Sequence, residues 1–263
     1  MLTPQKHYPK KHLGQHFLIN AGIKQKILKA CDLQADDIVL EIGPGTGALS
    51  YDIAQRVRTF YAVEKDRSLY DTLKKKLSPG GTRLFCADFL AFDLKQISGL
   101  TKIIGNLPYN MASPILGKLL DPNGPQLPVF AMVQYEFAKR MIARPHTKDY
   151  GALSCFIQYW SHPRILFHIK PAAFRPKPKV MSSFIHIQPR QHDPHCHDTA
   201  KLFKIIHQVF QQRRKTIANA LSPIIDKNAS AGLLLRLDIS PKLRPEDLSL
   251  IDYIHISNNM NNL

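Results

Sequence analysis

The chain has 263 residues, of which 44% are hydrophobic, so it can bury a sizeable core in one or two domains. It carries 36 Lys and Arg against 20 Asp and Glu, a formal net charge of +16. This excess favours a polyanionic partner over the alternative of a merely soluble basic protein. The absence of a long apolar span or signal-type segment argues against a membrane protein, and four scattered cysteines without a Cys-x-x-Cys pair predict reduced thiols in a cytoplasm.

The order of the predicted strands and helices along the chain indicates an α/β protein. Residues 1–12 form a basic arm that we expect to be flexible. Strand and helix patterns then alternate from about residue 20 to about residue 188, which is typical of a parallel sheet with crossover helices.

A glycine loop follows the first strong strand. Ile38–Ile42 is an apolar run suited to a central strand, Gly43–Gly47 has the spacing G-x-G-x-G, and Ala48–Val57 shows a helical apolar stripe. Glycines permit a tight turn and a close approach of the backbone to a ligand. The spacing differs from the dinucleotide pattern G-x-G-x-x-G, and Glu41 is unfavourable beside a pyrophosphate. We therefore favour a ligand with a sulfonium charge over NAD.

Polar residues follow the next strands at the same edge. Thr59–Val63 leads to Glu64, which lies where an acidic side chain meets ribose hydroxyls. Arg83–Cys86 leads to Asp88, which could accept from an adenine amine, and to Phe89, which could cover the ring. In open α/β sheets, ligands bind outside the carboxyl ends of the strands. Each acidic residue alone could be a helix cap, but the run from Gly43 to Asn106 favours one shared site.

The stretch Asn106–Tyr109 (Asn-Leu-Pro-Tyr) is the most informative motif. It follows the apolar pair Ile103–Ile104, and a strand ending in a proline turn is the plainer interpretation. An asparagine oxygen and a backbone carbonyl can each accept a hydrogen from one exocyclic amine, and a tyrosine can stack on the base. The motif therefore suits chemistry on the N6 amine of an extruded adenine.

The remaining elements are simpler. Val129–Val133 is predicted as a fifth strand, and Ile165–Ile169 with Ser182–Ile187 as a final antiparallel pair. Pro189–Asp198 is predicted as a linker, and only helical patterns follow to about Ser257. The linker holds a His/Cys cluster whose spacing does not match a closed zinc site, so we expect no metal there. Its members are His192, His195, Cys196 and His197.

Basic runs mark possible contacts with RNA. Lys74–Lys76 is most simply a solvated helix face. Arg175, Lys177 and Lys179 alternate with prolines after Phe174 and should form a stiff, extended segment. We interpret Phe174 as stacking on the target base opposite Tyr109, with a core position as the alternative.

These motifs together resemble the small-subunit ribosomal RNA adenine N6,N6-dimethyltransferases over roughly residues 10–255. The matching segments are Leu13–Leu18, Glu41–Gly47, Val63–Asp66, Asp88, Asn106–Tyr109, Met132–Gln134, Glu136–Arg140, Tyr150–Ser154, Pro171–Val180 and Phe210–Thr216. His16 stands where many members have Asn, so we expect its cofactor contact to come from the backbone.

The resemblance implies a seven-stranded, Rossmann-like, S-adenosylmethionine-dependent methyltransferase domain (13–190), a small helical RNA-binding domain (198–257) and a disordered tail (258–263). It implies dimethylation of two adjacent adenosines near the 3′ end of small-subunit rRNA by a cytoplasmic monomer acting on the 30S subunit or its precursor in ribosome biogenesis. The implied catalytic residues are Asn106, Leu107, Pro108, Tyr109 and Phe174. The implied cofactor contacts are His16, Leu18, Gly43, Gly45, Glu64, Asp88, Phe89 and Asn106. The implied RNA contacts are Arg175, Lys177, Lys179, Arg213, Arg214 and Lys215.

Three alternatives stay open at this point. The first is a large-subunit rRNA adenine methyltransferase of the macrolide-resistance type. The second is a non-catalytic rRNA-binding assembly factor, against which the intact Glu64, Asp88 and Asn106 argue. The third, DNA adenine methylation, would more usually show Asp-Pro-Pro-Tyr at residues 106–109.

Overall fold

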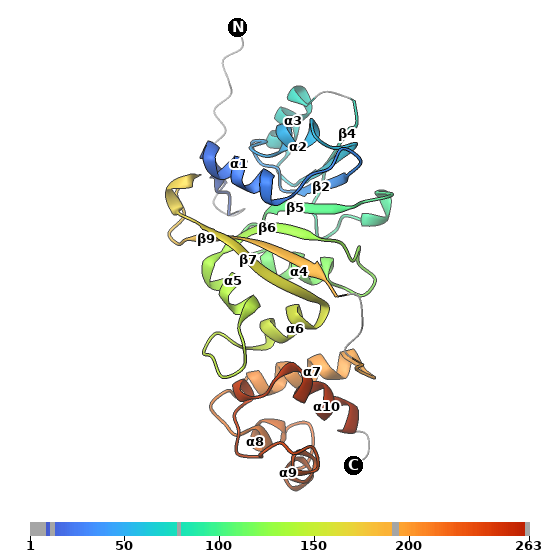
Figure 1. The fold of residues 1–263 in the computed structure, drawn as a ribbon, viewed down its shortest axis with the longest axis vertical. Helices are drawn as coiled ribbons and strands as arrows, with labels where there is room; N and C mark the ends of the chain where they lie inside the picture. The colour runs from blue at the N-terminus through green and yellow to red at the C-terminus, as the bar shows by residue number, and fades with distance from the viewer. Residues whose placement is uncertain (1–8, 11–13, 78–79, 191–194, 261–263) are drawn as a thin grey trace. The chain divides into compact units, whose positions relative to one another are not determined.

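A computed structural model describes residues 9–10, 14–77, 80–190 and 195–260 (Figure 1). The chain divides into two compact units. The first unit runs to Ala138 and also includes Arg164–Pro189, and the second contains Lys139–Pro163 and the chain from Arg190 onward. Most of the predicted basic arm, residues 1–8 and 11–12, lies outside the described residues.

The first unit is built on a seven-stranded mixed sheet, as predicted. The strand order is β4-β3-β2-β5-β6-β9-β7. The strands are β2 (Ile38–Ile42), β3 (Thr59–Glu64), β4 (Thr82–Cys86), β5 (Lys102–Asn106), β6 (Val129–Gln134), β7 (Ser161–Ile169) and β9 (Ser182–Pro189). Strands β2 to β6 pair in parallel, and β9 runs antiparallel to β6. A second sheet pairs β1 (Phe17–Leu18) with β8 (Phe174–Arg175).

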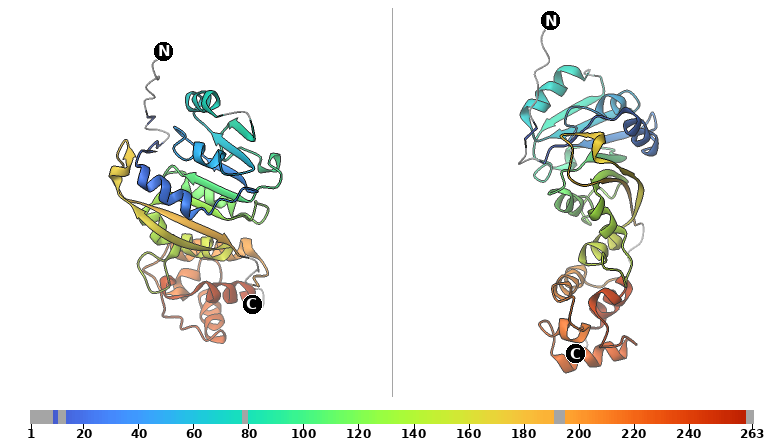
Figure 2. Two further views of the ribbon diagram at one scale, coloured as in Figure 1. Left: turned by 45° about the horizontal axis from the view of Figure 1, so that its top comes forward. Right: turned by 90° about the vertical axis from the view of Figure 1, so that its left-hand side faces the viewer.

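Short helices connect these strands. They are α1 (Ala21–Ala30), α2 (Ser50–Ala54), α3 (Arg67–Lys76), the 3-10 turn η2 (Leu94–Gln96), α4 (Ala112–Leu119), α5 (Tyr135–Ile142) and the 3-10 turn η3 (Pro171–Ala173). The right-hand view of Figure 2 looks along the sheet, with α1 and α4 on opposite sides of it. Helix α2 is shorter than the predicted Ala48–Val57, because the glycine turn continues through Leu49 and the helix ends at Ala54.

Apolar side chains on one face of the sheet form the core of this unit. Ile27 and Leu28 of α1 and Ile53 of α2 are buried against Val39, Phe60 and Ile104 of the strands. An unbroken apolar strand such as β2 is expected where helices cover a parallel sheet. The core therefore holds the carboxyl ends of β2, β3 and β5 rigidly at one edge.

The second unit is helical. It contains α6 (Ala152–Trp160), α7 (Thr199–Phe210), α8 (Ile217–Leu221), α9 (Lys227–Arg236), the 3-10 turn η4 (Pro245–Asp247) and α10 (Leu250–Asn259). The predicted stripe of α7 is confirmed, since Leu202, Ile205, Ile206 and Val209 are buried. Among the helices that the structure describes, none combines the length and apolar character needed to span a bilayer.

Two boundaries differ from the prediction. Residues 139–163 were expected in the methyltransferase domain, but Tyr150, Cys155 and Tyr159 share one apolar cluster with α7 and α10. The disordered tail was expected from Asn258, but Asn258 and Asn259 lie in α10, where Asn258 accepts from the His197 amide at 2.9 Å. The last three residues lie outside the described part of the chain.

Candidate active site

The glycine loop brings backbone atoms to the edge of the sheet. Gly43 and Gly45 have φ angles of +65° and +59°, in the left-handed region that favours glycine. A Cβ on Gly45 would lie 3.1 Å from the Phe17 ring. The tight turn beneath Phe17 therefore favours glycine at this position.

Glu64, at the end of β3, is fixed to this loop. One carboxylate oxygen accepts from the Gly45 amide at 3.0 Å, and the other accepts from the Asp66 amide at 2.8 Å. Glu64 is 7% exposed, and burial raises the pKa of its carboxyl group against these hydrogen bonds. The carboxylate is thus held in one orientation, with oxygen lone pairs left to accept hydroxyls.

Glu41 is a second buried acid at the pocket wall. Burial raises the pKa of its carboxyl group to about 7, and the nearby Glu64 raises this pKa further. The Ser50 hydroxyl donates a hydrogen bond to the Glu41 carboxyl group at 2.6 Å, which lowers the pKa. A cationic ligand would favour ionisation of both groups, whereas a phosphate would oppose it.

Asp88 and Phe89 follow β4, as predicted. Asp88 also has an ion-pair partner, Lys65, that the sequence did not predict. Asp88 accepts from Lys65 Nζ at 2.8 Å and from the Leu90 amide at 3.0 Å, and these bonds lower the pKa of its carboxyl group. Phe89 is buried and its ring lies at the pocket wall. An adenine amine at Asp88 would therefore share this carboxylate with Lys65.

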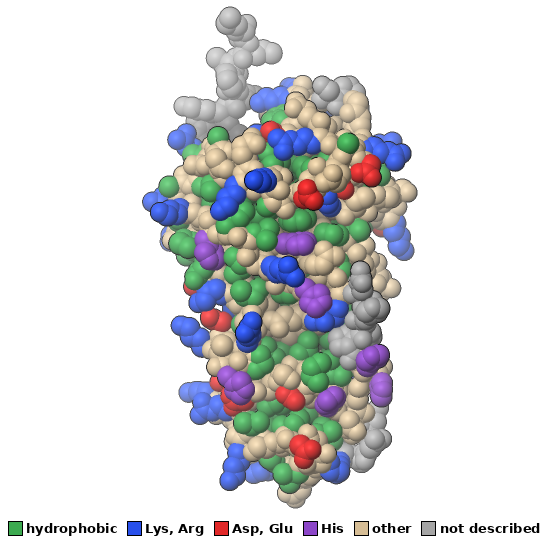
Figure 3. All heavy atoms as spheres, viewed as in Figure 1, with side chains coloured by type: hydrophobic (Ala, Val, Ile, Leu, Met, Phe, Trp, Pro, Cys, Tyr) green, Lys and Arg blue, Asp and Glu red, His purple; other side chains and the backbone are tan. Residues whose placement is uncertain are grey.

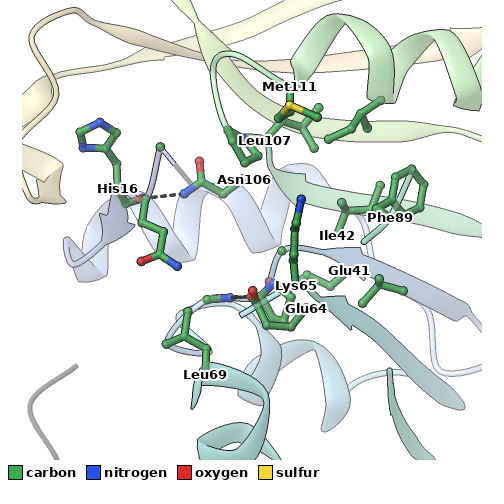
Figure 4. Close-up of a pocket in the computed structure, with 18 of the residues that line it drawn as sticks. His16, Glu41, Ile42, Glu64, Lys65, Leu69, Phe89, Asn106, Leu107 and Met111 are labelled. Atoms are coloured by element: carbon green, nitrogen blue, oxygen red, sulfur yellow. Dashed lines mark hydrogen bonds between the residues drawn. The ribbon is translucent and has the colours of Figure 1, made fainter. Parts of the chain in front are cut away.

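Asn106 is oriented by the segment before β1. Its side-chain nitrogen donates to the His16 carbonyl at 2.8 Å, and Figure 4 shows its amide oxygen turned away from this bond. The Leu107 amide donates to the Met132 carbonyl at 3.1 Å, and the Met111 amide to the Pro108 carbonyl at 2.8 Å. The Asn106 amide oxygen is thereby presented as an acceptor, with one orientation of the side chain selected.

Tyr109 is held by two contacts from distant parts of the chain. Its hydroxyl lies 2.7 Å from Ser182 Oγ, and burial raises its pKa. The His16 ring stacks on the Tyr109 ring at 5.6 Å between centroids, and His16 Nδ1 donates to the Pro176 carbonyl at 2.7 Å. The His16 carbonyl thus accepts from Asn106 while its ring packs on the tyrosine, and a contact of the His16 backbone with the cofactor stays a prediction.

One pocket gathers the predicted catalytic and cofactor-binding residues apart from Phe174, and none of the predicted RNA-binding residues (Figure 4). Its lining includes His16, Leu18, Gly43, Gly45, Glu64, Asp88, Phe89, Asn106, Leu107, Pro108 and Tyr109. It also includes residues that the sequence did not assign to the site, among them Phe17, Lys65 and Met132. The β1–β8 pairing that places Phe17 there joins residues far apart in the chain, so no local pattern indicates it.

Phe174 is a correction. It is 3% exposed and packs in the apolar core of the first unit, and it is not among the residues that line the pocket. Its backbone pairs with Leu18 in the β1–β8 sheet, and Leu18 belongs to the same buried cluster. The alternative of a core position is therefore the one observed.

The basic residues fall into two groups. Arg175, Lys177 and Lys179 are exposed, and so are Arg214 and Lys215. Arg213 is instead engaged within the second unit: it lies 3.5 Å from Glu246 and donates to the Lys148 carbonyl at 3.1 Å. Figure 3 shows Lys and Arg side chains scattered over the face that it draws. Among the described residues, no group of three or more His, Cys, Asp or Glu is arranged to hold a metal, and His192 lies outside them.

The seven-stranded sheet, its glycine loop and the pocket at the carboxyl ends of β2, β3 and β5 define a Rossmann-like methyltransferase. The family model for ribosomal RNA adenine dimethylase matches residues 6–262. The chain belongs to the ribosomal RNA adenine dimethylase family.

Relatives agree with this assignment. The chain is 38% identical over 259 residues to the ribosomal RNA small subunit methyltransferase A of Chromobacterium violaceum, covering 97% of each chain. It is 37% identical to the protein of that name from Buchnera aphidicola, covering 97% of this chain and 93% of the relative.

Two solved structures share the fold. A dimethyladenosine transferase from Plasmodium falciparum matches with a TM-score of 0.82 at 22% identity, covering 94% of this chain and 98% of that one. The 23S rRNA methyltransferase ErmE matches with a TM-score of 0.70 at 22% identity, covering 93% and 99%.

Proposed function

We propose that this protein dimethylates the N6 amines of two adjacent adenosines in a hairpin near the 3′ end of small-subunit rRNA, with S-adenosylmethionine as methyl donor. The observation that carries the proposal is the Asn106 side chain. Its nitrogen donates to the His16 carbonyl at 2.8 Å, which leaves the oxygen of this pocket-lining residue available as an acceptor. Membership of the adenine dimethylase family and the names of the relatives support adenine as the target and the small subunit as its source.

The residues of the pocket fit this methyl donor. Gly43 and Gly45 allow the backbone to approach a ligand closely, and the fixed Glu64 carboxylate can accept two ribose hydroxyls. Asp88 can accept from an adenine amine, with Phe89 against the ring, and the backbone at His16 and Leu18 can close the other side. The acidic walls at Glu41 and Glu64 favour a positive ligand. When bound, S-adenosylmethionine supplies an electrophilic methyl group on a cationic sulfur.

The residues of the chain then act by positioning. The lone pair of an adenine amine is delocalised into the ring, so it is a poor nucleophile. In our proposal the Asn106 oxygen and the Leu107 carbonyl accept the two N6 hydrogens in the first transfer, and one of them accepts the single remaining hydrogen in the second, which turns the lone pair toward the methyl group. Pro108 stiffens the turn and Tyr109, held by Ser182, stacks on the base. Each transfer would break the bond between sulfur and the methyl group and release the thioether product, the methylated amine would then lose its proton to solvent, and no covalent enzyme intermediate is needed.

We further propose that exposed basic residues bind the RNA backbone. Arg175, Lys177 and Lys179 lie beside Pro176, whose carbonyl contacts His16 at the pocket, so they are placed to hold phosphates near the target base. Arg214 and Lys215 are exposed on the helical unit and can hold a second stretch of RNA. The substrate in this proposal is the 30S subunit or its precursor, bound by a monomer in the cytoplasm.

Transfer of radiolabelled methyl groups tests the proposal. Unmethylated small subunits and large subunits are incubated separately with the enzyme, and the labelled nucleoside is identified. We expect N6,N6-dimethyladenosine from small subunits. Label in large subunits would favour the macrolide-resistance type of activity. A protein that binds rRNA but neither transfers label nor binds S-adenosylhomocysteine in a calorimetric titration would be a non-catalytic assembly factor.

A further inference from the structure

Lys118, on α4, forms hydrogen bonds to the loop that follows β4. Its ammonium group donates to the carbonyl oxygens of Phe89 and Leu90, each at 2.9 Å, and to that of Phe92. An ammonium group has three donors, so this one loop satisfies all of them. The Lys118 nitrogen also lies 5.2 Å from the centroid of the Phe89 ring. The contacts are therefore concentrated on one short turn.

That turn carries residues that line the pocket. The Ala91 amide donates to the Asp88 carbonyl at 3.0 Å, and the Phe92 amide to the Phe89 carbonyl at 3.2 Å. Asp88 and Phe89 face the pocket, whereas Lys118 does not line it. Lys118 thus holds the turn from the side away from the ligand, through backbone groups that are independent of the Lys65–Asp88 ion pair.

The charge environment of Lys118 combines partial burial with nearby carboxylates. Partial burial lowers the pKa of Lys118, while the nearby Asp93 and Asp88 raise it. Backbone carbonyls that converge on a cation stabilise its charged form. Helix α4 begins three residues after Tyr109, so the lysine connects the turn at Asp88 to the helix that follows the Asn106–Tyr109 motif.

We propose that Lys118 is a positioning residue that fixes Asp88 and Phe89 for the adenine ring of the methyl donor. The proposal rests on the proposed function, since it concerns the same ligand. Without the ammonium group, three carbonyls lose a shared donor and the turn can relax away from the pocket. The consequence is weaker binding of the ligand with the contact residues themselves intact.

Lys102 provides a matched control. It lies at the start of β5, its ammonium group donates to the Asp32 carbonyl at 2.5 Å and to Asp37 Oδ2 at 2.7 Å, and its side chain is 17% exposed. It is therefore another partly buried lysine that joins two segments, but it does not line the pocket. A general loss of stability should follow from either substitution, whereas a loss of ligand affinity should follow only from Lys118→Met.

The test titrates S-adenosylhomocysteine into the full chain by calorimetry. We expect Lys118→Met to raise Kd about tenfold, as is typical for loss of hydrogen bonds to a charged group, and Lys102→Met to leave it within about twofold. Hydrogen exchange at the amides of Ala91 and Phe92 should accelerate in Lys118→Met and not in Lys102→Met. An unchanged Kd in Lys118→Met, or equal losses in both variants, would overturn the proposal.

Two further outcomes keep the test decisive. If Lys118→Met does not fold, Lys118→Arg is titrated instead. A planar guanidinium cannot donate to three converging carbonyls as an ammonium does, so Kd should rise about threefold, and an unchanged Kd refutes the proposal. If the parent protein itself does not bind S-adenosylhomocysteine, the proposed function fails, which is a different result from parent-like binding by the variant.

Discussion

The Glu64→Gln substitution tests how the glycine loop holds the ligand. The two carboxylate oxygens accept from the Gly45 amide at 3.0 Å and from the Asp66 amide at 2.8 Å. Glutamine has one oxygen, so its NH₂ group must face one of these two N–H donors. The variant also loses the charge that would strengthen bonds to ribose hydroxyls.

The magnitude follows from the loss of that charge. A hydrogen bond to a charged group is worth about 1.5–3 kcal/mol, so weakening the bonds that ribose hydroxyls would donate to Glu64 corresponds to a rise in the Kd for ligand of about 10- to 100-fold. The effect on folding should be smaller, because burial raises the pKa of Glu64 and the variant avoids the cost of burying that charge. We therefore expect a large change in Kd with a small change in Tm.

Calorimetric titration of S-adenosylhomocysteine near neutral pH measures the effect. Asp226→Asn is the control, because Asp226 also accepts from two backbone amides, those of Asn228 and Ala229, but does not line the pocket. An affinity of Glu64→Gln within twofold of the parent would refute the assignment of Glu64 to the ligand. An equal loss in the control would attribute the effect to the fold in general.

Three other substitutions have distinct expected outcomes. Asn106→Ala should abolish most methyl transfer while ligand affinity stays measurable; near-normal transfer would remove Asn106 from the mechanism. Glu41→Gln tests pH dependence: because the pKa of Glu41 rises from 4.5 to about 7 in the folded state, the parent loses stability as pH rises through this window. Urea unfolding should show the variant gaining about 3 kcal/mol relative to the parent between about pH 5 and pH 8, and a constant difference would contradict the buried charge. Phe174→Ala should lower the free energy of unfolding by about 3–5 kcal/mol, as for a core aromatic residue, and a loss of activity without that destabilisation would restore a direct role on the base.

The residues at the carboxyl ends of the parallel strands could be predicted, because each strand and the polar residue after it form a local sequence pattern. Apolar runs end at Gly43, Glu64 and Asn106, and parallel strands bring such ends to one edge. The structure confirms the seven strands and places these residues around one pocket. Strand ends are therefore the part of this site that a sequence pattern describes well.

Contacts between distant segments could not be predicted in the same way. The bond from Tyr109 to Ser182 and the three bonds from Lys118 depend on how loops cross, which no periodicity encodes. Phe174 shows the same limit, since an aromatic residue before a proline-rich basic run suits both a binding surface and a core. The assignment of residues 139–163 to the second unit was also missed. Tyr150 and Tyr159 pack with α7, a contact between segments far apart in the chain that local sequence patterns do not indicate.

Methylation mapped in cells that lack their own small-subunit adenine dimethylation tests the proposed function in its natural setting. The parent chain and Asn106→Ala are expressed to equal levels, and the 3′ region of small-subunit rRNA is analysed by mass spectrometry. We expect dimethylation of two adjacent adenosines with the parent chain and little or none with the variant. Unmodified adenosines with the parent chain, or full dimethylation with Asn106→Ala, would contradict the proposal.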